Sequence, residues 1–350
     1  MPSTLSNVTN VFTLFSFSTA LWSTVSLFIL IEKKSPKEFG GYKNFMRIYC
    51  YYAFIFALTD WISQPSILID IRGFGYVFYA ENRLFDIGYT AGFVVQILYC
   101  GCFLASSSFL SLNFLYRYVS TVKSPFIIYF QGWRVVSVIL YCAVPFSVWS
   151  FLVYTLMGPR PERTAHLKVT TMLIEHLDLS GKPYVGVLCR HVSNSTGHEY
   201  GDIEWGTMGT LLGLFGFQGF FYTVSLFCGV LTYRHTMALF NMAKISKKLY
   251  EMQVQLLRAI VIQASVPLVL VYIPPSIMII GGMFGVYVGQ IGYLVVMSIS
   301  MYPPLDSLVF LLSIGAYRSA LFCQSNGSIE GQSGNKVANA NVSVLANVKV

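Results

Sequence analysis

Long apolar runs separated by short polar segments dominate this chain. Between Arg258 and Asp306, 47 consecutive residues carry no charged side chain, and four earlier uncharged stretches contain 25 to 31 residues each. About 20 apolar residues in a helix cross the roughly 30 Å hydrocarbon core of a bilayer. The runs are continuously apolar and do not alternate with period two, which excludes a membrane β-barrel. The pattern therefore predicts an all-α membrane protein with several spans.

Seven spans account for these runs. The 47-residue run is long enough for two helices, and the glycine-rich segment 281–285 supplies the turn between them, because glycine lets the backbone reverse at low steric cost. Around the spans, the chain divides into an N-terminal segment 1–10, a helical domain 11–322 with one long loop 158–205, and a polar tail 323–350 expected to be disordered. The predicted spans are 11–31, 45–69, 88–119, 135–157, 206–233, 256–281 and 290–314.

The distribution of positive charge predicts the orientation. The first span has no positive residue before it and ends at Lys33 and Lys34, which favours a retained helix with the N-terminus outside. With this orientation, 16 Lys and Arg residues face the cytoplasm and seven face the exterior. The net charge of +8 then reflects topology and attraction to anionic membrane lipid, and it does not indicate a nucleic-acid partner.

Two glycosylation sequons fall on the predicted outer side, at Asn7 in the N-terminal segment and at Asn194 in the long loop. Two more, at Asn326 and Asn341, fall in the cytoplasmic tail, where no modification is expected. Cys189 is the one cysteine predicted to lie outside, so no disulfide partner is evident for it unless the third span sits higher in the membrane.

No pattern of enzymatic chemistry accompanies the spans. The sequence has no glycine-rich phosphate loop, no His/Cys set with metal spacing and no nucleophile paired with a base, so we predict no catalytic residue, cofactor or metal site. Transporters usually show an internal repeat and paired ionisable groups near the midplane. This chain has an odd number of spans and no visible repeat. Its two acids within spans, Asp60 and Asp306, fit a receptor and a transporter or channel equally well.

Several motifs narrow the choice. The motifs are GYKNFM at 41–46, YCGCF at 99–103, LNFLYRYV at 112–119, QLLRA at 255–259 followed by Gln263, Pro267, Tyr272 and Pro274, and YPPLDSL at 302–308 followed by Tyr317 and Arg318. They stand in the same order, and on the corresponding spans, as in the nematode seven-transmembrane serpentine chemoreceptors of the str class, a family of olfactory-type receptors that this chain resembles from about residue 40 to 320.

The resemblance implies a seven-helix bundle of the G-protein-coupled-receptor type, which binds a small odorant or chemical cue and activates a heterotrimeric G protein. It also implies the plasma membrane, in sensory-neuron cilia, as the location; both a monomer and a dimer fit. A transporter or ligand-gated channel for a small solute is the alternative. Two positions depart from the family: Ser307 replaces a proline, so a kink must come from Pro303 and Pro304, and Tyr116 precedes Arg117 without the acid of rhodopsin-type receptors.

The resemblance assigns a set of residues to G-protein coupling and activation. Arg117 ends the third span on the cytoplasmic side, where it would engage the G protein; without that role it is an anchor whose stem snorkels to the interface. Asp306 needs polar partners in the bundle, whether it moves on activation or fixes packing. The full set is Tyr116, Arg117, Tyr118, Asp306 and the basic residues Lys244, Lys247 and Lys248 of the third cytoplasmic loop.

Candidate ligand contacts lie in the outer halves of the third, fifth, sixth and seventh spans. Helical spacing places three of them on one face of the third span. Aromatic walls with one or two amide groups suit a small, mostly apolar molecule, although each aromatic also fits plain helix packing. The predicted ligand-binding residues are Gln96, Tyr99, Phe103, Phe217, Gln218, Tyr272 and Tyr293.

Overall fold

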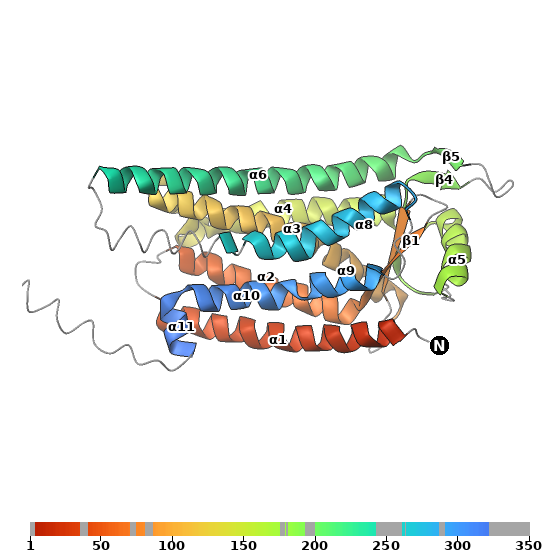
Figure 1. The fold of residues 1–350 in the computed structure, drawn as a ribbon, viewed down its shortest axis with the longest axis horizontal. Coiled ribbons are helices and arrows are strands. Elements are labelled where there is room, and N and C mark those ends of the chain that lie inside the picture. Colours follow the sequence, from red (N-terminus) through yellow and green to blue (C-terminus); the bar gives the residue numbers. More distant parts are fainter. Residues whose placement is uncertain are drawn as a thin grey trace, which may run out of the picture.

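The structure is a computed structural model in which helices lie side by side along one long axis (Figure 1). One end of the bundle carries the N-terminus and a small sheet, and we call it the sheet end. The opposite end, which includes Arg117, we call the Arg117 end. The described residues are 4–35, 41–70, 75–80, 87–175, 179, 181–192, 200–242, 261–262, 264–286 and 291–321.

In the described part of the chain, seven helical segments form the bundle. Six of them are long and apolar enough to cross a membrane. The seventh, α2, contains Lys43, Arg47 and Asp60 and packs between α1 and α3. The segments are α1 (Thr4–Lys34), α2 (Tyr42–Ser63), α3 (Tyr89–Thr121), α4 (Val136–Leu152) with its extensions η3 (Gly132–Val135) and η4 (Val153–Met157), α6 (Trp205–Asn241), η5 (Leu268–Tyr272) with α8 (Ile273–Met283), and α9 (Ile291–Ser300) with α10 (Tyr302–Ser313).

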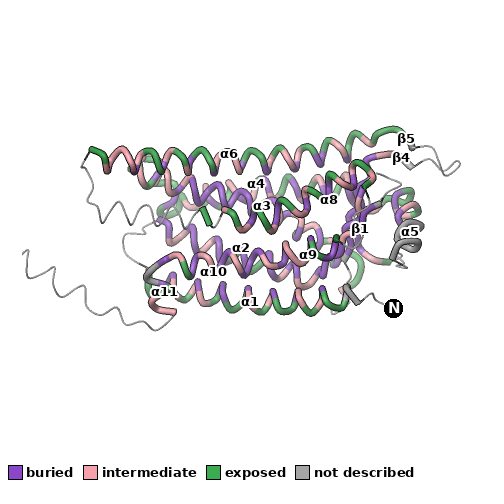
Figure 2. Tube along the Cα trace, in the orientation of Figure 1, coloured by how far each residue is buried: buried purple, intermediate pink, exposed green. Residues whose placement is uncertain are grey.

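Helix α3 is the centre of the bundle and contacts α2, α4 and α6. Small residues on α3, including Ser107, Ser108 and Ser111, are buried and allow the neighbouring helices to come close. Their hydroxyls donate to backbone carbonyls one turn earlier, as Ser107 does to Leu104, so they cost little in an apolar setting. Buried residues face the interior of the bundle, while α1, α4 and α6 present exposed apolar residues on the outside (Figure 2). Such a surface is typical of helices that contact lipid.

Three predicted span boundaries need correction. The second span was predicted to run to residue 69, but α2 ends at Ser63, where Gln64 adopts a left-handed conformation with φ of 43°, and Pro65–Asp70 forms a strand. The fifth helix extends to Asn241, beyond the predicted end at residue 233. The sixth segment extends past its predicted end at residue 281, because α8 continues to Met283 and a turn begins at Phe284 and Gly285.

The seventh segment is interrupted where the prolines predicted a kink. α9 ends at Ser300 and α10 begins at Tyr302, with Pro303 and Pro304 in its first turn. Proline fits a first helical turn because the N–H that it lacks would have no intrahelical partner there. The interruption lies directly before Pro303 and Pro304, and a bend caused by these two prolines stays a prediction. A short helix, α11 (Gly315–Leu321), then closes the Arg117 end (Figure 1).

A three-stranded antiparallel sheet lies across the sheet end, and the sequence analysis did not predict it. β1 (Pro65–Asp70) pairs with β2 (Gly75–Ala80), and β2 pairs with β3 (Tyr184–Leu188) from the long loop. In register, Ile67 lies opposite Phe78, and Phe78 lies opposite Val185. The same loop contains helix α5 (Pro161–Glu175) and a second hairpin of β4 (Arg190–Val192) and β5 (Tyr200–Ile203).

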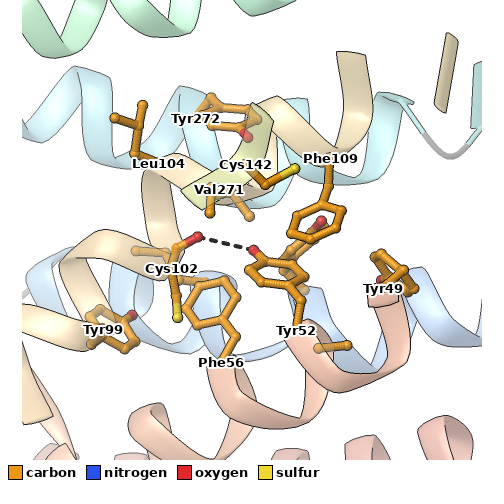
Figure 3. Packing of buried hydrophobic residues seen from close by; sticks show 14 of the residues in the cluster. Tyr49, Tyr52, Phe56, Tyr99, Cys102, Leu104, Phe109, Cys142, Val271 and Tyr272 are labelled. Atoms are coloured by element: carbon orange, nitrogen blue, oxygen red, sulfur yellow. Dashed lines mark hydrogen bonds between the residues drawn. The ribbon is translucent and has the colours of Figure 1, made fainter. Parts of the chain in front are cut away.

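Aromatic side chains fill the middle of the bundle. Tyr52 of α2 stacks on Phe109 of α3 with ring centroids 4.4 Å apart, and its hydroxyl donates to the Cys102 carbonyl at 3.0 Å (Figure 3). Tyr49 contacts both Phe109 and Phe310 of α10. Offset and edge-to-face ring contacts add to the stability that burial provides. The core therefore joins α2, α3 and α10 and leaves the space for a ligand nearer the sheet end.

Candidate functional site

A cavity of about 80 Å³ lies inside the bundle, beneath the sheet. Its walls come from α3, α4 with η4, α6, α8 and α9, and its roof comes from the three strands. Every lining residue is uncharged, and the polar groups of their side chains are two tyrosine hydroxyls, one indole N–H and one thiol. The lining residues are Ile67, Tyr76, Phe78, Tyr99, Cys100, Phe103, Trp149, Val153, Met157, Val185, Leu214, Pro275, Met278, Ile279 and Ile299.

The roof is tied to the helix beneath it. Gln96 of α3 is fully buried, and its side-chain amide donates to the Phe78 carbonyl of β2 at 2.6 Å. The Phe78 ring stacks on Tyr99, one turn further along α3, with centroids 5.5 Å apart. On the other side, Gly292 of α9 meets β1 so closely that an added Cβ would lie 2.2 Å from the Ile67 carbonyl oxygen. Backbone hydrogen bonds, one amide and close glycine contacts therefore fix the sheet over the cavity.

An arginine anchors the long loop to the bundle. Arg163 of α5 is 5% exposed, and its guanidinium donates to the carbonyls of Leu156 and Gly158, both at 3.0 Å. It also pairs with Glu204, directly before α6, at 3.2 Å. Burial lowers the pKa of Arg163, and the Glu204 carboxylate opposes that shift. This one side chain connects the end of the fourth helical segment, the loop helix and the start of α6.

The structure places the seven predicted ligand residues at different depths. Tyr99 and Phe103 line the cavity, whereas Gln96 holds the roof. Tyr272 lies behind Phe103, edge-on to its ring, and its hydroxyl is 2.6 Å from Ser106 Oγ. The remaining three residues, Phe217, Gln218 and Tyr293, are partly or fully buried on α6 and α9 and do not line the cavity. Ligand contact by any of the seven stays a prediction.

The sequence analysis missed most of the cavity. Its roof comes from a region that was divided between the second span and a loop, although the segments 65–70 and 75–80 flank a glycine-containing turn, which is a hairpin signal. The wall from the fourth span was not considered. It supplies Trp149, Val153 and Met157, and no polar residue distinguishes these three positions from lipid-facing ones.

A buried polar cluster lies next to the cavity. The carboxyl group of Asp60 on α2 faces the hydroxyls of Tyr99 on α3 and Ser300 on α9. All three residues are at most 3% exposed, so the surrounding helices shield the carboxyl group and the two hydroxyls from solvent. Since Tyr99 also lines the cavity, the cluster gives one corner of an otherwise apolar site a polar character.

Asp306 has the polar partners that its position in a span requires. It is 6% exposed, and Oδ2 accepts hydrogen bonds from Tyr49 at 2.5 Å and from Tyr302 at 3.2 Å. Ser307, where the family has proline, lies 3.2 Å from the Thr24 hydroxyl of α1. The expectation that Asp306 faces polar groups is confirmed. These bonds link α10 to α2, and a role in activation stays a prediction.

The predicted coupling residues of α3 lie at the Arg117 end. Tyr116 is buried and stacks on Tyr42 of α2, whereas Arg117 and Tyr118 are partly exposed. Lys244, Lys247 and Lys248 lie outside the described residues, as do Asn194 and the tail 323–350. Asn7 is exposed near the start of α1. Cys189 is a buried free thiol at the sheet end, and burial raises its pKa to about 11.

Seven packed helical segments with a cavity near one end have the architecture of a seven-transmembrane helix bundle of the G-protein-coupled-receptor type. In overall fold the chain is similar to squid rhodopsin, with a TM-score of 0.62 over 93% of this chain and 86% of that one at 12% sequence identity. The serpentine type 7TM GPCR chemoreceptor Str model matches residues 9–322, and the chain belongs to that family. It is therefore a non-enzymatic, multi-pass membrane protein.

Named relatives cover most of the chain. The chain is 26% identical over 307 residues to serpentine receptor class r-10 of Caenorhabditis elegans, covering 85% of this chain and 86% of that protein. It is 23% identical over 308 residues to the G-protein coupled receptor str-33 of the same organism, covering 88% of each. The family model's match to residues 9–322 includes both the strands of the roof and the Arg117 end.

Proposed function

We propose that this receptor detects a small, uncharged external molecule in the cavity beneath the sheet and passes the signal to a heterotrimeric G protein at the Arg117 end. The observation that carries the proposal is the cavity itself, lined by residues of five helical segments and a sheet without a single charged side chain. Ligand sites are concave and mostly apolar, with a few polar groups that orient the ligand. Here those groups are the hydroxyls of Tyr76 and Tyr99 and, behind Tyr99, the Asp60 cluster.

The size of the cavity limits the ligand. An apolar cavity of about 150 Å³ in another protein holds benzene. A cavity of about 80 Å³ has about half that volume and therefore suits a molecule smaller than benzene, unless the walls move. A charged molecule would lose its hydration without gaining an ionic partner in the walls. Small odorants and similar uncharged chemical cues meet both conditions.

Signalling follows from unequal affinity for two states of the bundle. A ligand shifts a conformational equilibrium only when it binds one state better than the other. The ligand would favour the state in which the cytoplasmic face opens beside Arg117. That face, together with the basic third cytoplasmic loop, would then promote nucleotide exchange on the G protein. Lys244, Lys247 and Lys248 of this loop would contact the G protein or anionic lipid headgroups.

A ligand screen tests the proposal directly. The receptor is expressed in a cell that reports second messengers, and uncharged molecules up to the size of benzene are tested. Leu214→Trp should then raise the half-maximal concentration of an active compound by about tenfold or more, because the larger side chain occupies the cavity that Leu214 lines. Leu212→Trp is the matched control, since Leu212 lies two residues away on α6 and is 59% exposed.

The outcome separates the two classes of function. Equal responses from the Leu214→Trp and Leu212→Trp receptors would place the ligand elsewhere. A current or uptake of the compound without any second messenger would support a channel or transporter, the alternative for a chain of this composition. Both variants are compared at equal surface expression, so a folding defect is not read as a loss of affinity.

The proposed orientation places the sheet end outside the plasma membrane and the Arg117 end in the cytoplasm. In the cell, sensory-neuron cilia are the expected site, and the receptor acts as a monomer or a dimer. Asn7→Gln should therefore remove a glycan and increase gel mobility, while Asn326→Gln should leave mobility unchanged. Asn194→Gln should also remove a glycan. A glycan on Asn326 would contradict the seven-span topology.

A further inference from the structure

In the described part of the chain, the Arg117 side chain contacts the aromatic ring of Tyr42 and not an acidic side chain. The guanidinium carbon lies 4.7 Å from the centroid of the Tyr42 ring. Among the described residues no Asp or Glu forms an ion pair with Arg117, and its buried Nε forms no hydrogen bond. A guanidinium above an aromatic face is attracted by the electron density of the ring, and the attraction is stronger when water is excluded.

The Tyr42 ring is itself fixed in place. It is 2% exposed, its hydroxyl donates to Asn113 Oδ1 at 3.1 Å, and its face stacks on Tyr116 with centroids 4.9 Å apart. Tyr116 in turn meets Phe130 edge-on at 4.8 Å. Next to Tyr42, an added Cβ on Gly41 would lie 2.5 Å from the Phe130 carbonyl oxygen, so the start of α2 is packed closely against that segment. The ring is therefore a rigid platform for the guanidinium.

We propose that Tyr42 is a positioning residue that holds Arg117 in the resting receptor. This inference rests on the proposed function, because it assumes that Arg117 acts on the G protein. Tyr42 lies in the first turn of α2 and Arg117 near the end of α3. To reach a partner outside the bundle, the guanidinium must leave the ring. In the resting state an uncharged ring, that of Tyr42, thus retains the Arg117 guanidinium. This fits a chain in which the residue before Arg117 is a tyrosine and not an acid.

Substitutions at Tyr42 separate the ring from its hydroxyl. Tyr42→Leu removes the aromatic face and should raise ligand-independent signalling by about fivefold to thirtyfold at equal surface expression, the change expected when a desolvated cation–π contact is lost. Tyr42→Phe keeps the aromatic face and removes the hydroxyl, which bonds to Asn113 and also interacts with Arg117. If the ring holds the guanidinium, the basal signal of this variant should stay close to that of the unmodified receptor; a raised basal signal would assign the hold to the hydroxyl. Tyr42→Met also removes the ring, but its longer, flexible side chain fills more of the space of the ring than leucine does. It therefore tests the loss of the ring with a smaller loss of packing.

Combining substitutions distinguishes this inference from the proposed function. The basal signal of Tyr42→Leu should disappear in a Tyr42→Leu, Arg117→Ala double variant, because the released arginine is what acts. If Tyr42→Leu or Tyr42→Met reaches the surface with an unchanged basal signal while Arg117→Ala still abolishes the response to ligand, Tyr42 does not hold Arg117. If Tyr42→Leu and Tyr42→Met are both retained inside the cell, the inference is also wrong, and Tyr42 is needed for folding of the receptor. Full signalling by Arg117→Ala would instead contradict the proposed function.

Discussion

Arg117→Ala should abolish ligand-evoked signalling while leaving surface expression and ligand binding largely intact. Arg117 lies near the end of α3, and the cavity begins more than three helical turns away, at Phe103, so the substitution does not alter the ligand site. It removes the positive charge that we expect to meet the G protein. The expected result is a second-messenger signal at background over the whole range of ligand concentrations.

A matched control is available at the same end of the bundle. Arg134 is exposed beside Trp133 in the segment before α4, with its guanidinium 6.0 Å from that ring. Arg134→Ala removes an equal charge and should leave the response unchanged. If Arg117→Ala signals at full strength, Arg117 is only a membrane anchor. If ligand evokes a current or uptake without any G protein, channel or transport activity takes the place of the receptor mechanism.

The positions of the spans were readable from the sequence because lipid imposes one simple rule on a helix. Apolar length and flanking charge define a span almost by themselves. The same rule explains the error at the end of α2. The apolar residues 67–69 of the strand are buried or partly buried, because Ile67 lines the cavity while Leu68 and Ile69 pack into neighbouring hydrophobic clusters, so they continue the apolar run of the helix. The change from helix to strand is indicated only by Gln64 and Pro65, which affect the backbone conformation and leave the hydropathy of the run unchanged.

The candidate site was harder to predict than the spans. Helical spacing correctly grouped Tyr99 and Phe103 on one face of α3, but it could not show that this face meets a strand hairpin and the fourth helical segment. Gln96 illustrates the difficulty. Its buried side-chain amide suggested a ligand contact. In the structure, the amide N–H instead donates a hydrogen bond to the Phe78 carbonyl. The arrangement of Tyr42 over Arg117 joins residues 75 positions apart in the sequence, and no local pattern indicates it.

The second large effect is expected at a glycine of the roof. Gly75 begins β2, and an added Cβ would lie 1.8 Å from the Val187 carbonyl oxygen of β3, which is backbone and has no rotamer to adopt. The carbonyl oxygen of Gly75 is itself close to α8, 2.9 Å from where a Cβ on Gly282 would stand. A methyl group at Gly75 must therefore push β3 away from β2 or the hairpin away from α8, and either movement opens the roof of the cavity.

We therefore expect Gly75→Ala to reduce the amount of receptor at the surface severalfold, since even about 1–2 kcal/mol of lost stability changes the abundance of a protein by that factor. The receptor that reaches the surface should need a higher ligand concentration, because the roof residues no longer enclose the ligand. Gly209→Ala is the matched control: Gly209 lies on α6 with nothing within 4 Å of an added Cβ, and alanine is the better helix former. Surface labelling and ligand titration measure both effects. Normal abundance and normal potency of Gly75→Ala would mean that the sheet does not close the ligand site.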